Sequence, residues 1–276
     1  MIVAPRLQLG NLSTEERWGL GLLVAIVALG SLVPALSPYD ARLGGSGVPL
    51  DAPSVAHLFG TDDLGRDVFT RAFAAAQSDL TLALIGVVIP LSIGTLIGAI
   101  IGTTRFPLVS GLWMIVVESI NAFPFIVIVL ALVSVVGGGA VGVVVALSLT
   151  NWARYAKLAR ARAQVIRGAD FIHATQVLGY SRARVLLRHI LPNVYSESIA
   201  YALSDFVLVI LVIAGLSYLG AGLKPPAPEW GAMMSDGRLF ITTAWWIPVF
   251  PGLILSLTAV AVALLANGMQ RRRGRD

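Results

Sequence analysis

Cysteine is absent from the 276-residue sequence, which excludes disulfide bonds, thiolate metal sites and cysteine nucleophiles. Charge is also scarce. Asp, Glu, Lys and Arg make up 13% of the chain, whereas 57% is hydrophobic and the mean hydropathy is +0.82. The net charge of +5 would suit a nucleic-acid-binding protein, but the basic residues lie beside apolar runs, as they do in membrane proteins. The composition therefore predicts an integral membrane protein.

The sequence also lacks the residues needed for chemistry of its own. Its two lysines, Lys157 and Lys224, do not follow the Gly-x-x-x-x-Gly of a phosphate-binding loop, in which a lysine reaches the bound nucleotide. The three histidines, His57, His173 and His189, have no His-x-x-x-His spacing. We expect no catalytic residue, cofactor or metal in this chain, and we expect that it is not an enzyme.

Six apolar stretches have about the length needed to cross a hydrocarbon core of roughly 30 Å, which predicts an all-α membrane protein with six transmembrane helices. These stretches are residues 18–36, 80–102, 108–136, 140–155, 199–219 and 245–265. The fourth is interrupted by Asn151 and Arg154, so its helix is expected to continue beyond the membrane. A cleaved signal peptide is the alternative for the first, but the run is longer than a signal peptide's apolar region.

The distribution of basic residues predicts the topology. Of the 20 Lys and Arg residues, fifteen fall in segments that share one side, and five fall in the two long loops on the other side. Since cytoplasmic segments carry the excess of basic residues, both termini are predicted to be cytoplasmic. The segments are the N-terminus 1–17, the external loop 37–79, the membrane core 80–268 with the cytoplasmic loop 156–192 and the external loop 220–244, and the basic tail 269–276.

Three polar residues within predicted spans are candidates for a translocation pathway or a gate. Glu118 and Asn121 precede Pro124 in the third span, and Asp205 lies in the fifth. An ionisable group inside a bilayer is costly and usually faces protein or water. A pathway role and a structural pairing role both fit these residues.

The longest interval without an apolar span, Asn151 to Pro192, is strongly basic and has helical composition. Gly179 is expected to end one short helix, Ser181 to cap a second, and Pro192 to stop it. Two readings follow from these residues alone: a docking element for a soluble partner, or an ordinary basic cytoplasmic loop.

A resemblance favours docking. The segment HATQVLGYSRARVLLRHILPN resembles the "EAA" loop of binding-protein-dependent ABC importer permeases, with Gly179, Leu191 and Pro192 at matching positions and His173 where Glu is usual. In that family the loop is a cytoplasmic coupling helix that sits in a groove of the ATPase subunit. The resemblance implies such a contact for Asp170, His173, Ala174, Thr175, Leu178, Gly179, Tyr180 and Ser181.

Two further stretches narrow the resemblance to the C-type permease of the dipeptide, oligopeptide and nickel group. They are HLFGTDDLGRDVFTR, from His57, and LSYLGAGLKPPAPEWGAMMSDGR, from Leu216. The resemblance implies a type I permease in the inner or plasma membrane that forms half of an import pathway for peptides or a related solute. The implied partners are a homologous B-type permease, two ATPase subunits that bind the ATP and Mg²⁺, and an extracytoplasmic solute-binding protein.

The same two stretches also have a purely structural interpretation. Thr61 to Asp67 lacks the alternating ligands of a calcium loop and is expected to form a turn and a capped helix start, and the proline-rich loop a stiff elbow with Trp230 at the membrane interface. The resemblance adds external contacts to the partner permease or binding protein. The candidates are Asp62, Asp63, Arg66, Asp67 and Trp230.

Two other functions remain open. In a secondary transporter, Glu118 or Asp205 would carry protons, and internal inverted repeats would be expected. A non-transporting membrane scaffold would need neither a pathway nor a motor. We expect instead a permease driven by a separate ATPase.

Overall fold

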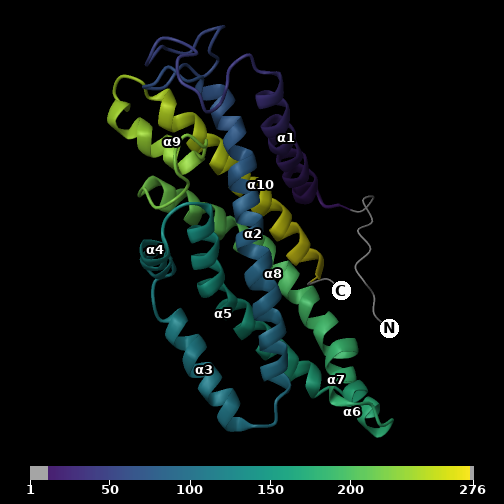
Figure 1. Ribbon diagram of the computed structural model, residues 1–276. Helices are drawn as coiled ribbons and strands as arrows, with labels where there is room; N and C mark the ends of the chain where they lie inside the picture. Colours follow the sequence, from purple (N-terminus) through teal and green to yellow (C-terminus); the bar gives the residue numbers. More distant parts are fainter. Residues whose placement is uncertain (1–11, 274–276) are drawn as a thin grey trace.

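A computed structural model describes residues 12–273, and within this range every regular element is a helix (Figure 1). The elements are α1 (Thr14–Leu36), α2 (Val68–Thr103), α3 (Pro107–Asn121), α4 (Phe125–Val136), α5 (Ala140–Arg167), α6 (Asp170–Val177), α7 (Arg182–Val185), the π-helical turn η2 (Leu186–Ile190), α8 (Leu191–Tyr218), α9 (Trp230–Gly237), the 3₁₀ turn η3 (Arg238–Phe240) and α10 (Trp246–Arg273). The prediction of an all-helical membrane protein is confirmed. The predicted N-terminal segment and basic tail extend beyond the described residues.

By length and composition, four helices of the described chain are suited to cross a membrane: α1, α2, the continuous α7–α8 helix and α10. The count rises to five if the bent pair α3 and α4 is one span. Helix α5 covers the predicted fourth span but continues through the basic residues to Arg167, which lowers its hydropathy. The expectation of six spans is therefore met in part.

The 36-residue helix α2 is the axis of the bundle and packs against α1, α5 and α8 (Figure 1). Its contact with α5 depends on three glycines spaced four residues apart, Gly94, Gly98 and Gly102. A Cβ at each would lie 2.8 Å from the Cβ of Tyr155, Ala159 and Ala163, respectively. Small residues at this spacing let two membrane helices approach closely.

The start of α1 and the end of α10 lie beside each other. Ser13 and Glu16 form a capping box at the start of α1. Glu15 accepts from Arg271 at 2.7 Å and Glu16 from Arg272 at 2.5 Å, so the first turn of α1 is joined to the last turns of α10. Helices α1 and α10 also run side by side (Figure 1).

The expected outer loop 37–79 ends earlier than predicted. Helix α2 begins at Val68, because the Asp67 side chain accepts from the Thr70 backbone N–H at 2.7 Å and caps the helix. Residues 68–79 therefore belong to the helix rather than to the loop. Three polar residues in this stretch, Thr70, Arg71 and Asp79, are buried against other elements of the chain.

The single span expected at residues 108–136 is broken. Helices α3 and α4 meet at an angle of 89°, and Asn121 and Phe125 bound the break. Pro124 explains its position, because proline disfavours helical geometry at the residue before it and cannot donate to the helix ladder. The Arg154 guanidinium lies 4.0 Å from the Phe125 ring centroid and ties the start of α4 to α5.

The prediction that Pro192 stops a helix is wrong. Pro192 lies in the first turn of α8, and the chain stays helical from Arg182 to Tyr218. The wider turn η2 directly precedes it. A π-type turn shifts the hydrogen-bond register, so the missing proline N–H falls where the ladder has already been rearranged.

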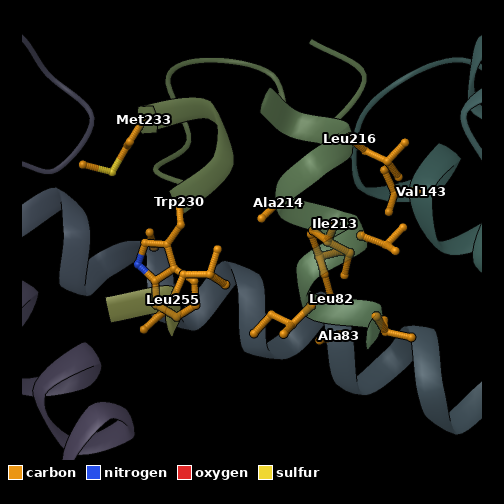
Figure 2. Packing of buried hydrophobic residues seen from close by; sticks show 14 of the residues in the cluster. Leu82, Ala83, Val143, Ile213, Ala214, Leu216, Trp230, Met233 and Leu255 are labelled. Atoms are coloured by element: carbon orange, nitrogen blue, oxygen red, sulfur yellow. The ribbon is translucent and has the colours of Figure 1, made fainter. Parts of the chain in front are cut away.

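One apolar core joins α2, α8, α9 and α10 at the end of the bundle where α9 lies. Figure 2 shows this layer, with Leu82 and Ala83 from α2, Ile213 and Ala214 from α8, Trp230 and Met233 from α9, and Leu255 from α10. A second, smaller core lies at the opposite end and includes Ala159, Ile172, Val185 and Ile190. The two cores hold the two candidate sites.

Candidate functional site

The first candidate site is the short helical element at the far end of the bundle from α9, which we call the tip and define as residues 170–181 (Figure 1). Gly179 has φ +77°, a conformation that favours glycine, and no other residue lies within 4 Å of where its Cβ would be. The backbone N–H of Tyr180 donates to Thr175 O at 3.1 Å, which closes the turn after α6. Ser181 then caps α7 by accepting from the Arg184 N–H at 3.3 Å.

Most residues expected to contact an ATPase are exposed on the tip. They are Asp170, His173, Ala174, Leu178, Gly179, Tyr180 and Ser181. Thr175 is the exception, since it is 8% exposed and its hydroxyl donates to Ile172 O at 2.7 Å. The tip therefore presents one continuous turn of chain to a partner, while Thr175 holds it together from inside.

Two exposed apolar residues of the tip were not among the contact residues predicted from the sequence. Phe171 is 50% exposed and Val177 is 87% exposed, next to Leu178 at 71%. Large apolar side chains exposed on a short helix that is not a candidate membrane span indicate a surface for another protein. The sequence could have indicated them, because they are large apolar residues in a segment that is too polar to be a membrane span.

The tip is fixed rigidly to the spans. Ile172 is fully buried and packs with Ala163 and Ile166 of α5 and with Val185 and Ile190 of the α7–α8 helix. Since these helices continue through the bundle, a force on the tip would move α5 and α8 as well.

The second candidate site is the outer cap, which we define as residues 37–67. Its centre is Asp62, whose carboxylate accepts from the Leu64 and Arg66 backbone N–H groups at 2.9 Å and from Arg66 Nε at 2.5 Å. Asp67 links His57, 2.8 Å from Nδ1, to the start of α2. The Trp246 indole of α10 donates to Thr61 O at 3.0 Å and attaches the cap to the last helix.

Burial corrects the expected external contacts. Asp62, Arg66 and Asp67 are 3%, 6% and 1% exposed within this single chain, so they stabilise the cap and do not offer their side chains to a partner. The side chain of Asp63 is 39% exposed, and it alone of the four charged candidates is open to contact.

Trp230, expected at the membrane interface, is fully buried. Its indole Nε1 donates to Ala72 O at 2.8 Å, and its backbone N–H donates to Asp79 Oδ2 at 3.0 Å. Figure 2 shows it inside the apolar layer. Trp230 therefore docks α9 onto α2, and the proline-rich loop brings it there.

Next to Trp230 lies a pair of buried acids, Asp79 and Glu229. Glu229 caps α9 by accepting from the Gly231 and Ala232 N–H groups at 2.9 and 2.7 Å, and its carboxyl also interacts with that of Asp79. Burial is the main cause that raises the pKa of Glu229 above its ordinary range.

The polar residues of the predicted spans have structural partners. Glu118 pairs with Lys157 at 2.8 Å, linking α3 to α5, and both side chains are about half exposed. Asp205 is buried in α8 and accepts from Asn151 Nδ2 at 2.6 Å and from the Tyr155 hydroxyl at 2.8 Å. Asn121 lies at the break between α3 and α4, where its Nδ2 has no partner within the described chain.

Comparison with known proteins agrees with this architecture. Residues 94–275 match the family described as binding-protein-dependent transport system inner membrane component. A putative peptide transport system permease protein of Brucella suis is 33% identical over 254 residues, which is 92% of this chain and 85% of that protein. The dipeptide transport system permease protein DppC of Alkalihalophilus pseudofirmus is 32% identical over 257 residues, covering 91% and 83%. The glutathione transport system permease protein GsiD of Escherichia coli is 34% identical over 254 residues, covering 90% and 82%.

Proposed function

Since this chain belongs to the family of binding-protein-dependent transport system inner membrane components, and is therefore a permease subunit of an ABC importer, we propose that it forms half of an import pathway for peptides. The relatives named above are permeases for peptides, dipeptides and glutathione, which are short peptides or peptide-like solutes. The other half of the pathway comes from a homologous permease. Two ATPase subunits and an extracytoplasmic binding protein complete the importer.

The tip is the contact for an ATPase subunit, and it carries the proposal. Its exposed apolar residues Phe171, Val177 and Leu178 need a partner, and its buried residue Ile172 connects that partner to the spans. A rigid element of this kind transmits movement of a motor subunit with little loss.

The proposed topology has six crossings with both termini in the cytoplasm. Helix α5 provides the fourth crossing, and its basic C-terminal half, from Arg154 to Arg167, leads out of the membrane to the tip. The pair α3 and α4 provides the third. The ion pairs between α1 and α10 hold the start of α1 beside the end of α10, which fits two termini on one side of the membrane.

The proposed mechanism is alternating access. When ATP binding closes the two ATPases, the tips of the two permeases approach each other, and α5 and α8 rotate with them from an inward-open to an outward-open arrangement. The outer cap and α9 move as one body with α2 and α10, because buried hydrogen bonds join them. Asp63, whose side chain is 39% exposed while Asp62, Arg66 and Asp67 are buried, would contact the binding protein.

Reconstitution of the complete importer in proteoliposomes tests this function. Uptake of a labelled peptide should require ATP and both ATPase subunits. Gly179→Val should abolish uptake and ATPase association while leaving membrane insertion intact, because a β-branched residue is strongly disfavoured at φ +77°. The matched variant Gly179→Asn, which tolerates that conformation, should retain both. Uphill uptake without the ATPases would contradict the proposal.

A further inference from the structure

A basic cavity opens at the tip end of the bundle, between the α2–α3 connection and the end of α5. Its volume is about 430 Å³, and its polar lining includes Thr104, Arg105, Ser110, Gln164 and Arg167. No acidic residue lines it. The cavity is separate from the tip and from the outer cap, and nothing in the proposed transport cycle uses it.

Arg105 and Arg167 line this cavity, Arg160 bonds to its lining residue Ser110, and none of the three has a carboxylate partner in the described chain. Arg160 donates from Nε and Nη2 to the Ser110 hydroxyl at 3.3 and 2.9 Å, and Arg167 donates from Nη1 to Thr104 O at 3.0 Å. Arg105 is exposed. These bonds hold two guanidinium groups at the cavity through neutral oxygens, so their positive charge is not neutralised. Nearby arginines on this end do find acids, for example Arg162, which pairs with Glu197 at 2.6 Å.

The first turn of α3 adds to the positive character of the cavity. This 15-residue helix begins at Pro107, and no side chain caps its N-terminus. The unpaired N–H groups of the first turn and the helix dipole both favour an anion there. Together with Arg105, Arg160 and Arg167, they offer several hydrogen-bond donors to one phosphate group, whose oxygens accept strongly from guanidinium groups.

The outer surface of α3 beside the cavity is apolar. Leu108, Leu112 and Ile115, spaced three to four residues apart, are 78%, 63% and 64% exposed and share one face of the helix. Phe106, at the rim of the cavity, is 67% exposed. A ligand that filled the cavity and also covered this stripe would need a phosphate head and hydrocarbon tails.

We propose that this cavity binds the phosphodiester headgroup of an anionic phospholipid, whose acyl chains lie along Leu108, Leu112 and Ile115 of α3. A basic pocket beside a membrane span, next to an apolar helix face, is the arrangement in which such headgroups bind. The lipid would fix the start of α3 to the end of α5, at the end of α3 opposite its break with α4. The inference is independent of the transported solute.

The test uses the purified, delipidated importer complex. Lipid binding is measured by native mass spectrometry with phosphatidylglycerol or with the zwitterionic phosphatidylcholine, and thermal stability is measured with each lipid and with inorganic phosphate alone. We expect one tightly bound phosphatidylglycerol per copy of this chain, with phosphatidylcholine bound at least ~10-fold more weakly. Inorganic phosphate at millimolar concentration should stabilise the complex far less than phosphatidylglycerol does.

The double variant Arg105→Gln/Arg167→Gln should weaken phosphatidylglycerol binding about 30-fold. The control Arg162→Gln/Arg188→Gln removes the same charge at the same end of the bundle and should change binding less than about 3-fold. Equal binding of the two lipids to the wild-type complex, which requires no variant to fold, would overturn the proposal. So would full stabilisation by inorganic phosphate, or the absence of bound phosphatidylglycerol because a partner subunit occupies the cavity.

Discussion

The indole Nε1 of Trp230 donates a hydrogen bond to the carbonyl oxygen of Ala72 over 2.8 Å, although 158 positions separate the two residues. This bond fastens the short outer helix α9 to the first turns of α2. It also explains why Trp230 is fully buried rather than at the membrane interface. Part of the resemblance to C-type permeases therefore rests on residues that build the outer end of the fold.

Replacement of Trp230 should destabilise the chain strongly. Trp230→Ala removes the largest fully buried side chain and leaves a cavity, at an expected cost of about 3–5 kcal/mol. The control Trp18→Ala changes a residue that is 72% exposed and should cost less than about 1 kcal/mol. The purified importer is heated, and the fraction that remains folded is measured by size-exclusion chromatography with a detection signal that does not depend on tryptophan. The melting temperatures of both variants are compared in this way. Similar losses for the two variants would show that α9 is not docked as described.

The attachment of α9 should weaken as pH rises. A carboxyl whose pKa is raised in the folded protein contributes stability that is complete below its ordinary pKa and is lost as pH passes the raised value. Burial raises the pKa of Glu229 in this way, and Asp79 is its acidic neighbour. Hydrogen exchange of the α9 amides, corrected for the intrinsic pH dependence, should therefore reveal more frequent opening at about pH 8 than at about pH 5.

Glu229→Gln should flatten that pH dependence, because an amide does not titrate in this range. The variant should keep α9 in place at high pH, since one side-chain oxygen still accepts from the first turn of the helix. A wild-type slope that survives in Glu229→Gln would assign the titration to another group.

The close contact of α2 and α5 should not tolerate even one added methyl group. A Cβ at Gly98 would lie 2.8 Å from the Ala159 Cβ and closer still to the Ala156 carbonyl, so Gly98→Ala should cost about 1–3 kcal/mol. Gly111→Ala is the matched control. No other atom lies within 4 Å of the Cβ position there, and the gain in helix propensity should leave stability unchanged or slightly raised. The measurement is the melting temperature of each variant in the same detergent, which should fall for Gly98→Ala and not for Gly111→Ala.

Substitution of Asp205 should reduce the stability of the chain more than it reduces transport by a stable complex. Asp205→Ala leaves the buried donors of Asn151 and Tyr155 unpaired and should cost about 2–5 kcal/mol, whereas Asp205→Asn keeps one acceptor and should cost less. In a stable complex, Asp205→Asn should retain ATP-driven uptake. Loss of uptake at unchanged melting temperature would instead place Asp205 in the pathway or in a proton relay.

The sequence predicted the features that depend on local pattern. Apolar runs located α1, α2, α8 and α10, and the glycine and serine of the tip located its turn and its cap. Each of these depends on residues near one another in the chain, where periodicity and capping rules apply.

The errors came from interactions between distant segments. The sequence around Trp230 predicts an interfacial tryptophan, because it does not show that Ala72 and Asp79 lie beside it in the fold. Asp62 and Arg66 were likewise predicted to be exposed, but they pair with each other and are buried in the outer cap. Pro192 was misread for a different reason. A widened turn before it absorbs the missing hydrogen bond, and composition carries no signal for such a turn.

The central claim is that the tip is held by a cytoplasmic ATPase, and one measurement addresses it directly. Because the chain has no cysteine, Leu178→Cys and the control Val55→Cys, in the outer cap, each introduce a single thiol. We expect a membrane-impermeant maleimide to label Val55→Cys in intact cells and to leave Leu178→Cys unlabelled. In opened membranes, a short bis-maleimide should join Leu178→Cys to an ATPase subunit. Labelling of Leu178→Cys from outside, or no crosslinked ATPase, would contradict the account.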